Sequence, residues 1–130
     1  MIALDTNLLV RLAVRDDATQ LARVAKLLSK EDALILSSVL LETEWVLRSR
    51  YQLLPGEIAA FFNYLASADG LEFENPTAVL TAIAAFEQGV GFADALHVAT
   101  ASHRGLVFHT FDVPLKRRAG RIKGAQIAGV

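Results

Sequence analysis

The sequence contains no cysteine, which excludes disulfide bridges and metal sites built from thiolates. It also has no internal repeat, low-complexity tract or linker-like segment. No window holds the roughly 20 apolar residues of a transmembrane helix. The apolar start is interrupted at Asp5, Asn7 and Arg11, unlike a signal peptide. We therefore expect a soluble cytoplasmic protein that does not contact a membrane.

Apolar residues, by contrast, are abundant: 53% of the 130 residues are hydrophobic. That content is far above the content of disordered chains, which cannot bury enough apolar surface to fold. The length suits one domain with a hydrophobic core of its own. We predict a single domain over residues 1–130.

The net charge of −1 hides an uneven distribution of charge along the chain. Residues 101–130 carry six basic side chains against the single acid Asp112, a net charge of +5, whereas residues 1–100 carry −6. Such an asymmetry hints at contact with a polyanion, although a solvated face of a terminal helix would explain it as well. The basic residues are Arg104, Lys116, Arg117, Arg118, Arg121 and Lys123.

Short apolar strands alternate with amphipathic helices along the whole chain. Helices are predicted over 17–30, 37–51, 55–68, 75–88, 92–102 and 113–119, and a first helix follows the cap-forming residues 5–7. Strands are predicted over 1–4, 33–36, 71–73, 106–109 and 125–128. This order is typical of α/β folds. We predict a short parallel sheet of four or five strands, covered on both faces by about seven helices.

Two aspartates follow predicted strands. Asp5 ends the first strand, and Asp112 follows the strand at 106–109. Open α/β sheets bind ligands at the carboxyl ends of their strands, so we expect both acids at that edge. Each could equally be the N-cap of the helix that it precedes.

Two further acids lie within apolar helical segments. Glu42 and Asp94 share helical faces with apolar residues, and burying an unpaired acid on such a face is costly. Asp94 is close enough to a helix start to be stabilised by the helix dipole instead. For Glu42 the neighbouring Glu44 is an alternative, because one of the two must be solvated.

The sequence offers no obvious buried lysine or arginine as a partner for these four acids. We therefore predict a divalent cation, because Mg²⁺ and Mn²⁺ prefer carboxylate oxygens and retained waters. Such a site turns a bound water into a nucleophile and neutralises the charge that develops on a phosphate. Together with a basic stretch that holds a polyanion, this chemistry suits phosphodiester hydrolysis.

Four short motifs, in this order, resemble those of the PIN-domain ribonucleases, in particular the VapC-like toxin subunits of type II toxin–antitoxin modules. The motifs are Leu4-Asp5-Thr6-Asn7, Ser38-Val39-Leu40-Leu41-Glu42, Phe92-Ala93-Asp94-Ala95-Leu96 and Thr110-Phe111-Asp112. The resemblance extends over nearly the whole chain. It implies the PIN fold, a three-layer α/β/α arrangement.

The resemblance also implies a role for each matching residue. Asp5, Asp94 and Asp112 match metal-binding aspartates for Mg²⁺ or Mn²⁺, and Glu42 matches the acidic partner that orders metal or water. Residues that position the carboxylates or the scissile phosphate are implied at Thr6, Asn7 and Thr110. All four acids are therefore the candidate catalytic residues.

The implied activity is endonucleolytic cleavage of RNA, commonly tRNA or rRNA. The implied partners are a cognate antitoxin that inhibits the enzyme, a second copy of the chain in a homodimer, and heterotetramers or larger assemblies with the antitoxin. Lys116, Arg117, Arg118 and Arg121 are candidates for contact with the RNA or with an acidic antitoxin segment.

Three other functions stay open. The chain could be a solitary PIN nuclease in RNA maturation or decay, a non-catalytic PIN module that binds RNA, or a receiver-like domain with a phosphoacceptor aspartate. The non-catalytic module is disfavoured because all four acids are present, and the receiver because no lysine follows the strand at 106–109. His97, His103 and His109 lack metal-ligand spacing, so we expect surface or core-edge positions for them.

Overall fold

A computed structural model describes all residues from 1 to 130, with seven helices and five short strands. The chain forms two compact units, unit 1 (Met1–Glu74) and unit 2 (Asn75–Val130). Unit 1 holds a parallel sheet of three strands that lie side by side in sequence order, and unit 2 holds a pair of parallel strands. The predicted α/β class, parallel pairing and seven helices are confirmed, with the strands divided between sheets of three and two.

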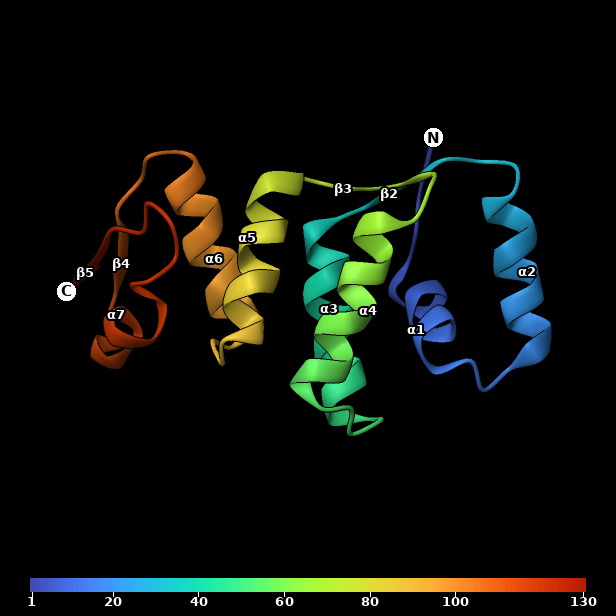
Figure 1. Ribbon diagram of the computed structural model, residues 1–130, viewed down its shortest axis with the longest axis horizontal. Helices are drawn as coiled ribbons and strands as arrows, with labels where there is room; N and C mark the ends of the chain where they lie inside the picture. Colours follow the sequence, from blue (N-terminus) through green and yellow to red (C-terminus); the bar gives the residue numbers. More distant parts are fainter. The chain divides into compact units, whose positions relative to one another are not determined.

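Unit 1 contains the first seven elements of the chain. They are β1 (Ile2–Ala3), α1 (Thr6–Val14), α2 (Ala18–Leu28), β2 (Ala33–Ile35), α3 (Ser37–Ser49), α4 (Pro55–Ser67) and β3 (Leu71–Phe73). Helices α3 and α4 run side by side, and α1 contacts both α2 and α3 (Figure 1). In the sheet, Ala33 pairs with Ile2 on one side and with Leu71 on the other. Since the strands are parallel, the chain leaves β1 and β2 at the same edge.

Unit 2 contains the remaining five elements. They are α5 (Pro76–Glu87), α6 (Phe92–His103), β4 (Phe108–Thr110), α7 (Val113–Ala119) and β5 (Ile127–Gly129). Helices α5 and α6 pack along each other (Figure 1), and α7 contacts both α6 and β5. The two strands pair from Phe108 with Ile127 to Thr110 with Gly129.

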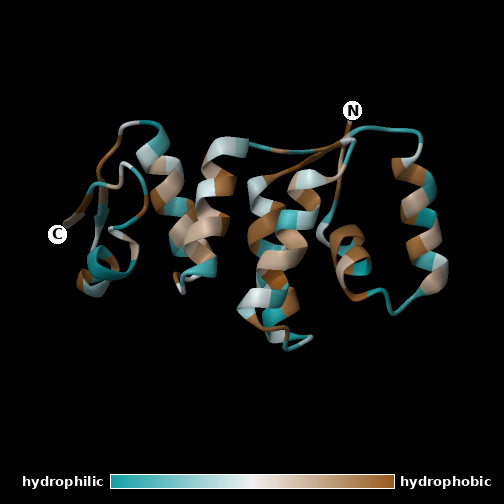
Figure 2. Cartoon of the chain, in the orientation of Figure 1, coloured by the Kyte–Doolittle hydropathy of each residue, from teal (hydrophilic) through white to brown (hydrophobic).

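Each unit buries apolar side chains along one stripe of its helices. Figure 2 shows apolar and polar residues side by side on the helices, which is the pattern that lets a helix cover a core and still face water. Fully buried side chains include Leu9, Ile35, Leu40, Leu47 and Phe62 in unit 1, and Val79, Ile83, Phe92 and Leu115 in unit 2. Burying one such side chain contributes about 1.5–3 kcal/mol.

Local signals explain the helix starts. Pro55 and Pro76 stand in the first turns of α4 and α5, and Pro114 stands in the first turn of α7. Proline is tolerated there because its missing N–H has no intrahelical partner to lose. Asp17 caps α2 by accepting a hydrogen bond from Gln20 N at 2.9 Å.

The last two strands begin about two residues later than the sequence predicts. After α6, Gly105 adopts a positive φ of 69°, and Leu106 N still donates to Ala101 O at 2.9 Å. Pairing with β5 starts only when Phe108 N donates to Gln126 O at 2.7 Å. The apolar residues 106–107 therefore belong to the turn. A strand needs a partner strand, and the backbone amide of Leu106 is already bonded to the end of α6.

The helices are short throughout. The longest of them, α3 and α4, have 13 residues each, and none has the length and apolar character to cross a membrane.

Candidate functional site

Asp5 lies directly after β1 and is the N-cap of α1. Its backbone is extended (φ −79°, ψ 160°), and its Oδ1 accepts a hydrogen bond from Thr6 N at 2.8 Å. Beside it, Leu4 is 3% exposed and anchors the turn in the core, while the Asp5 carboxylate faces solvent. The cap interpretation is thus confirmed, and it is compatible with metal binding because the cap bond uses Oδ1.

Thr6 connects Asp5 to the second acid of unit 1. The Thr6 side chain is buried, and its Oγ1 donates a hydrogen bond to Oε1 of Glu42 on α3. One threonine therefore holds Asp5 through its backbone N–H and Glu42 through its hydroxyl. Two acids that are far apart in the sequence are brought together on adjacent elements, since α1 packs against α3.

Glu42 does not lie on the core-facing stripe of α3, contrary to the expectation from its apolar neighbours. The buried positions are Leu40, Thr43, Glu44 and Leu47, with Glu44 only 5% exposed. Glu44 is stabilised there by Arg48, whose Nε lies 2.7 Å from Glu44 Oε2. Apolar residues around 39–47 would allow either of two faces of α3 to turn toward the core. In the folded protein the face that is buried leaves Glu42 exposed.

Asp94 stands in the first turn of α6, where Gly91 is the N-cap. The helix is anchored by Phe92 and Ala95, which are 2% and 0% exposed, whereas the Asp94 side chain is 40% exposed. A carboxylate in the first turn is favoured by the helix dipole. Both the predicted first-turn position and a solvent-accessible carboxylate are therefore present.

Asp112 occupies the N-cap position of α7, but its side chain makes no cap hydrogen bond. Its backbone is held instead by Thr110, the last residue of β4, whose Oγ1 accepts from Asp112 N at 2.9 Å. The Asp112 side chain is 46% exposed. Thr110 thus positions Asp112, while the carboxylate stays available for other contacts.

Arg118 joins the two aspartates of unit 2. Its Nη2 lies 2.8 Å from Asp112 Oδ2 and 3.5 Å from Asp94 Oδ2. The hydrogen bond to Asp112 raises the pKa of Arg118 above its ordinary value, with a smaller contribution from the charge of Asp94. The sequence offered no obvious buried basic partner for the four acids, but an exposed one, Arg118, pairs with two of them. A signal was present, because Arg118 follows Asp112 within the same short helical segment.

The donor chemistry of both pairs suits a hard divalent cation. Unit 1 offers the carboxylates of Asp5 and Glu42, and unit 2 those of Asp94 and Asp112. Carboxylate oxygens without sulfur or imidazole favour Mg²⁺ or Mn²⁺. No group of three potential metal ligands is gathered around one point. In unit 2 a positive group, the guanidinium of Arg118, already stands where two carboxylate oxygens converge, so a cation fits there.

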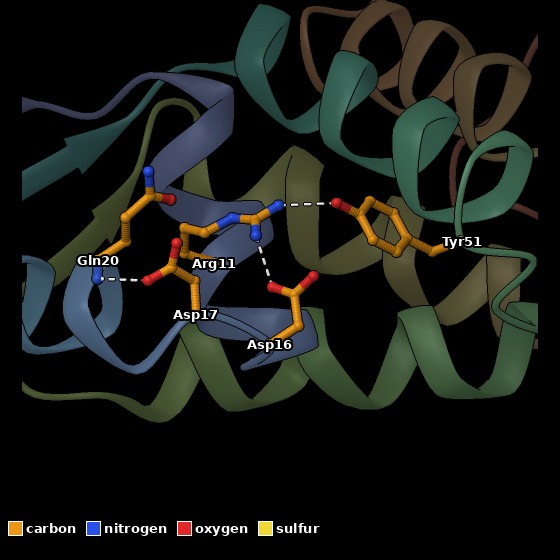
Figure 3. Close-up of polar contacts among 5 residues, drawn as sticks. All are labelled: Arg11, Asp16, Asp17, Gln20 and Tyr51. Atoms are coloured by element: carbon orange, nitrogen blue, oxygen red, sulfur yellow. Dashed lines mark hydrogen bonds and ion pairs between the residues drawn. The ribbon is translucent and has the colours of Figure 1, made fainter.

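Asn7 lines a cavity of about 310 Å³ between α1 and α2. Arg11 also lines it, and its own contacts are drawn in Figure 3. Arg11 Nη1 lies 2.5 Å from Asp16 Oδ1, and Nη2 donates to the Tyr51 hydroxyl at 2.7 Å. The Tyr51 hydrogen bond is the main cause that raises the pKa of Arg11. These contacts tie the end of α1 to the loop before α2 and to the chain after α3.

The basic C-terminal residues line a groove in unit 2. The groove has a volume of about 560 Å³, and its walls come from α5 and from the segment 117–123. Four basic side chains line it: Arg117, Arg118, Arg121 and Lys123. Lys116, the remaining candidate, is exposed on α7. Arg118 therefore belongs both to the groove and to the aspartate pair.

The histidines have structural surroundings. His97 is exposed, and its ring stacks on Phe108 with 6.2 Å between ring centroids. His103 lies in the last turn of α6, where a basic group complements the helix dipole.

Comparison with known families gives a match over nearly the whole chain. The sequence model of the PIN domain matches residues 2–121. A search of curated proteins gives no significant match. PIN domains are generally metal-dependent nucleases that act on RNA. Since the match covers both carboxylate pairs and the turns that hold them, the chain belongs to the PIN domain family.

Proposed function

We propose that this protein is a Mg²⁺- or Mn²⁺-dependent endoribonuclease and the toxin of a toxin–antitoxin pair. The observation that carries the proposal is the convergence of Asp94 Oδ2 and Asp112 Oδ2 on a single positively charged nitrogen, beside a groove lined by four basic side chains. The family match supports a nuclease acting on RNA. The expected substrates are tRNA or rRNA, and the expected assemblies are a homodimer and larger complexes with an antitoxin.

In this proposal Asp5, Asp94 and Asp112 hold the metal, and Glu42 orders water. When bound, the metal supplies an activated water and neutralises charge on the scissile phosphate. Thr6 holds Asp5 and Glu42 through two hydrogen bonds, and Thr110 holds the backbone of Asp112. These contacts keep the carboxylates in place before metal and substrate arrive, which lowers the cost of assembling the site.

The basic groove supplies the contact with the RNA backbone. Arg117, Arg121 and Lys123 present positive charge in one concave surface of unit 2. Contacts with phosphates provide affinity without reading sequence, and they weaken as the salt concentration rises. We therefore expect RNA binding with a marked dependence on salt.

The decisive experiment measures cleavage of structured RNA by the purified protein with Mn²⁺, and by two single variants. Asp5→Asn in unit 1 and Asp94→Asn in unit 2 should each lower the cleavage rate at least about 100-fold, because each removes one charged oxygen ligand. Asp69→Asn is the matched control, since Asp69 is an exposed aspartate before β3 rather than after a strand. Wild-type protein that leaves RNA intact with Mn²⁺ would refute the nuclease proposal.

Expression in a bacterial host tests the toxin role separately. Wild-type protein should arrest growth with cleavage of cellular RNA, and Asp94→Asn should do neither. Cleavage in vitro without growth arrest would instead support a solitary nuclease of RNA maturation or decay. Binding of RNA without cleavage would support a non-catalytic module.

A further inference from the structure

We propose that Arg118 is an internal counter-ion of the Asp94–Asp112 pair, which a divalent metal must displace, so that Arg118 sets the metal affinity of the protein. The inference rests on the proposed function, because it takes Asp94 and Asp112 as metal ligands. It goes beyond that function by assigning a role to a residue of the basic groove that is separate from phosphate binding.

The geometry places one nitrogen in contact with both of the carboxylate oxygens that would hold a metal. The same atom, Nη2 of Arg118, contacts Oδ2 of Asp112 at 2.8 Å and Oδ2 of Asp94 at 3.5 Å. A Mg²⁺ ion held by these two oxygens would need to lie about 2.0–2.1 Å from each of them. A guanidinium and a metal cannot share that position, so the two cations exclude each other.

Arg118 is free to leave without loss of the helix that carries it. Its side chain is 42% exposed, whereas α7 is anchored by Leu115 and Ala119, which are 2% and 0% exposed. Long exposed side chains change rotamer on a fast timescale. Displacement of Arg118 therefore needs no unfolding of α7.

The competition cannot be relieved by deprotonation of the arginine. Arginine side chains stay protonated in proteins, so Arg118 keeps its positive charge. Metal entry depends on physical displacement of the side chain.

Once displaced from the aspartates, the guanidinium of Arg118 can move into the groove that Arg118 already lines. Its neighbours there are Arg117, Arg121 and Lys123. Four positive charges in one groove repel one another, unless an anion lies between them. An RNA phosphate in the groove would receive Arg118, so substrate binding and metal binding would favour each other.

Titration of Mn²⁺ tests the proposal without measuring activity. The dissociation constant is measured by electron paramagnetic resonance of free Mn²⁺ for purified wild type, Arg118→Gln, Arg118→Lys and Arg121→Gln. Arg121→Gln is the matched control, because it removes the same charge from the same groove without touching either aspartate. We expect Arg118→Gln to bind Mn²⁺ about three- to tenfold more tightly than wild type, Arg118→Lys to lie between them, and Arg121→Gln to change by less than about twofold.

Thermal unfolding gives a second readout. In EDTA, Arg118→Gln leaves two like charges side by side, so its Tm should be lower than that of Arg121→Gln, and Mn²⁺ should raise it more. If Arg118→Gln does not fold, Arg118→Lys is compared with Arg121→Gln in the same way.

Three outcomes would overturn the inference. Equal Mn²⁺ affinities of wild type and Arg118→Gln would refute it while leaving the nuclease proposal intact, as would weaker binding by Arg118→Gln. Absence of Mn²⁺ binding by every variant would also refute the inference. The nuclease proposal would fail with it if the wild type also left RNA intact, whereas RNA cleavage by the wild type would mean that only the proposed metal site is wrong.

Discussion

The two carboxylate pairs of this protein are held by different kinds of interaction. In unit 1, Asp5 and Glu42 are organised by neutral donors, the N–H and the hydroxyl of the buried Thr6. In unit 2, Asp94 and Asp112 are organised by a charge, the guanidinium of Arg118. A neutral donor orients a carboxylate and leaves its negative charge in place. A cation offsets one of the two negative charges of the pair and competes with any second cation.

Two of the three arginines that pair with acids, Arg11 and Arg118, show a related contrast. Arg11 is largely enclosed, with 19% of its side chain exposed, and it contacts Asp16 and the Tyr51 hydroxyl (Figure 3). Arg118 is 42% exposed, and both of its acidic partners are candidate metal ligands. We therefore interpret Arg11 as a structural link between elements, and Arg118 as a group with a function at the site.

The largest effect should separate Asp112, which contacts a charged group, from Glu42, which contacts a neutral one. Asp112→Asn loses a charged ligand and the ion pair with Arg118, so RNA cleavage should fall about 100-fold. Glu42→Gln keeps an oxygen that can accept from Thr6, so cleavage should fall only about tenfold. Initial rates at saturating Mn²⁺ measure both. Equal losses would mean that the kind of contact does not distinguish these two acids.

The two arginines should differ in their effect on stability. Arg11→Ala removes a charged hydrogen bond to Tyr51 and the pair with Asp16, and should cost about 1–2 kcal/mol of unfolding free energy. Arg118→Ala should cost less, because its contacts are exposed and screened by solvent. Urea unfolding in EDTA measures both variants. A larger loss for Arg118→Ala would show that Arg118 is the structural link.

The smallest effect concerns the two threonines that hold the acids. Thr6→Val removes a buried hydroxyl and should cost about 1 kcal/mol of unfolding free energy. Thr110→Val removes an acceptor from the exposed N–H of Asp112, which water replaces, and should cost about 0.5 kcal/mol. Urea unfolding of both variants gives the order. The reverse order would indicate that the turn after β4 is more tightly held than the turn after β1.

Local signals in the sequence were enough to predict the helices. The period of apolar residues, the caps and the three first-turn prolines place the helices within a few residues of their observed bounds. The strands β4 and β5 were predicted about two residues too early, because their start depends on a partner strand and on the turn at Gly105. The division of strands between two sheets likewise depends on pairing over long sequence distances.

For the candidate site, the sequence by itself determined where the four candidate acids stand along the chain: after β1 and β4, or within α3 and α6. It did so because strand ends and helix starts follow from short-range patterns. Only the tertiary structure decided that Glu44 rather than Glu42 is buried, since two helical phases of α3 are equally apolar locally. Only the tertiary structure, too, decided that Arg118 also reaches Asp94, because that contact is set by how α6 and α7 pack, whereas Asp112 belongs to the same short segment as Arg118.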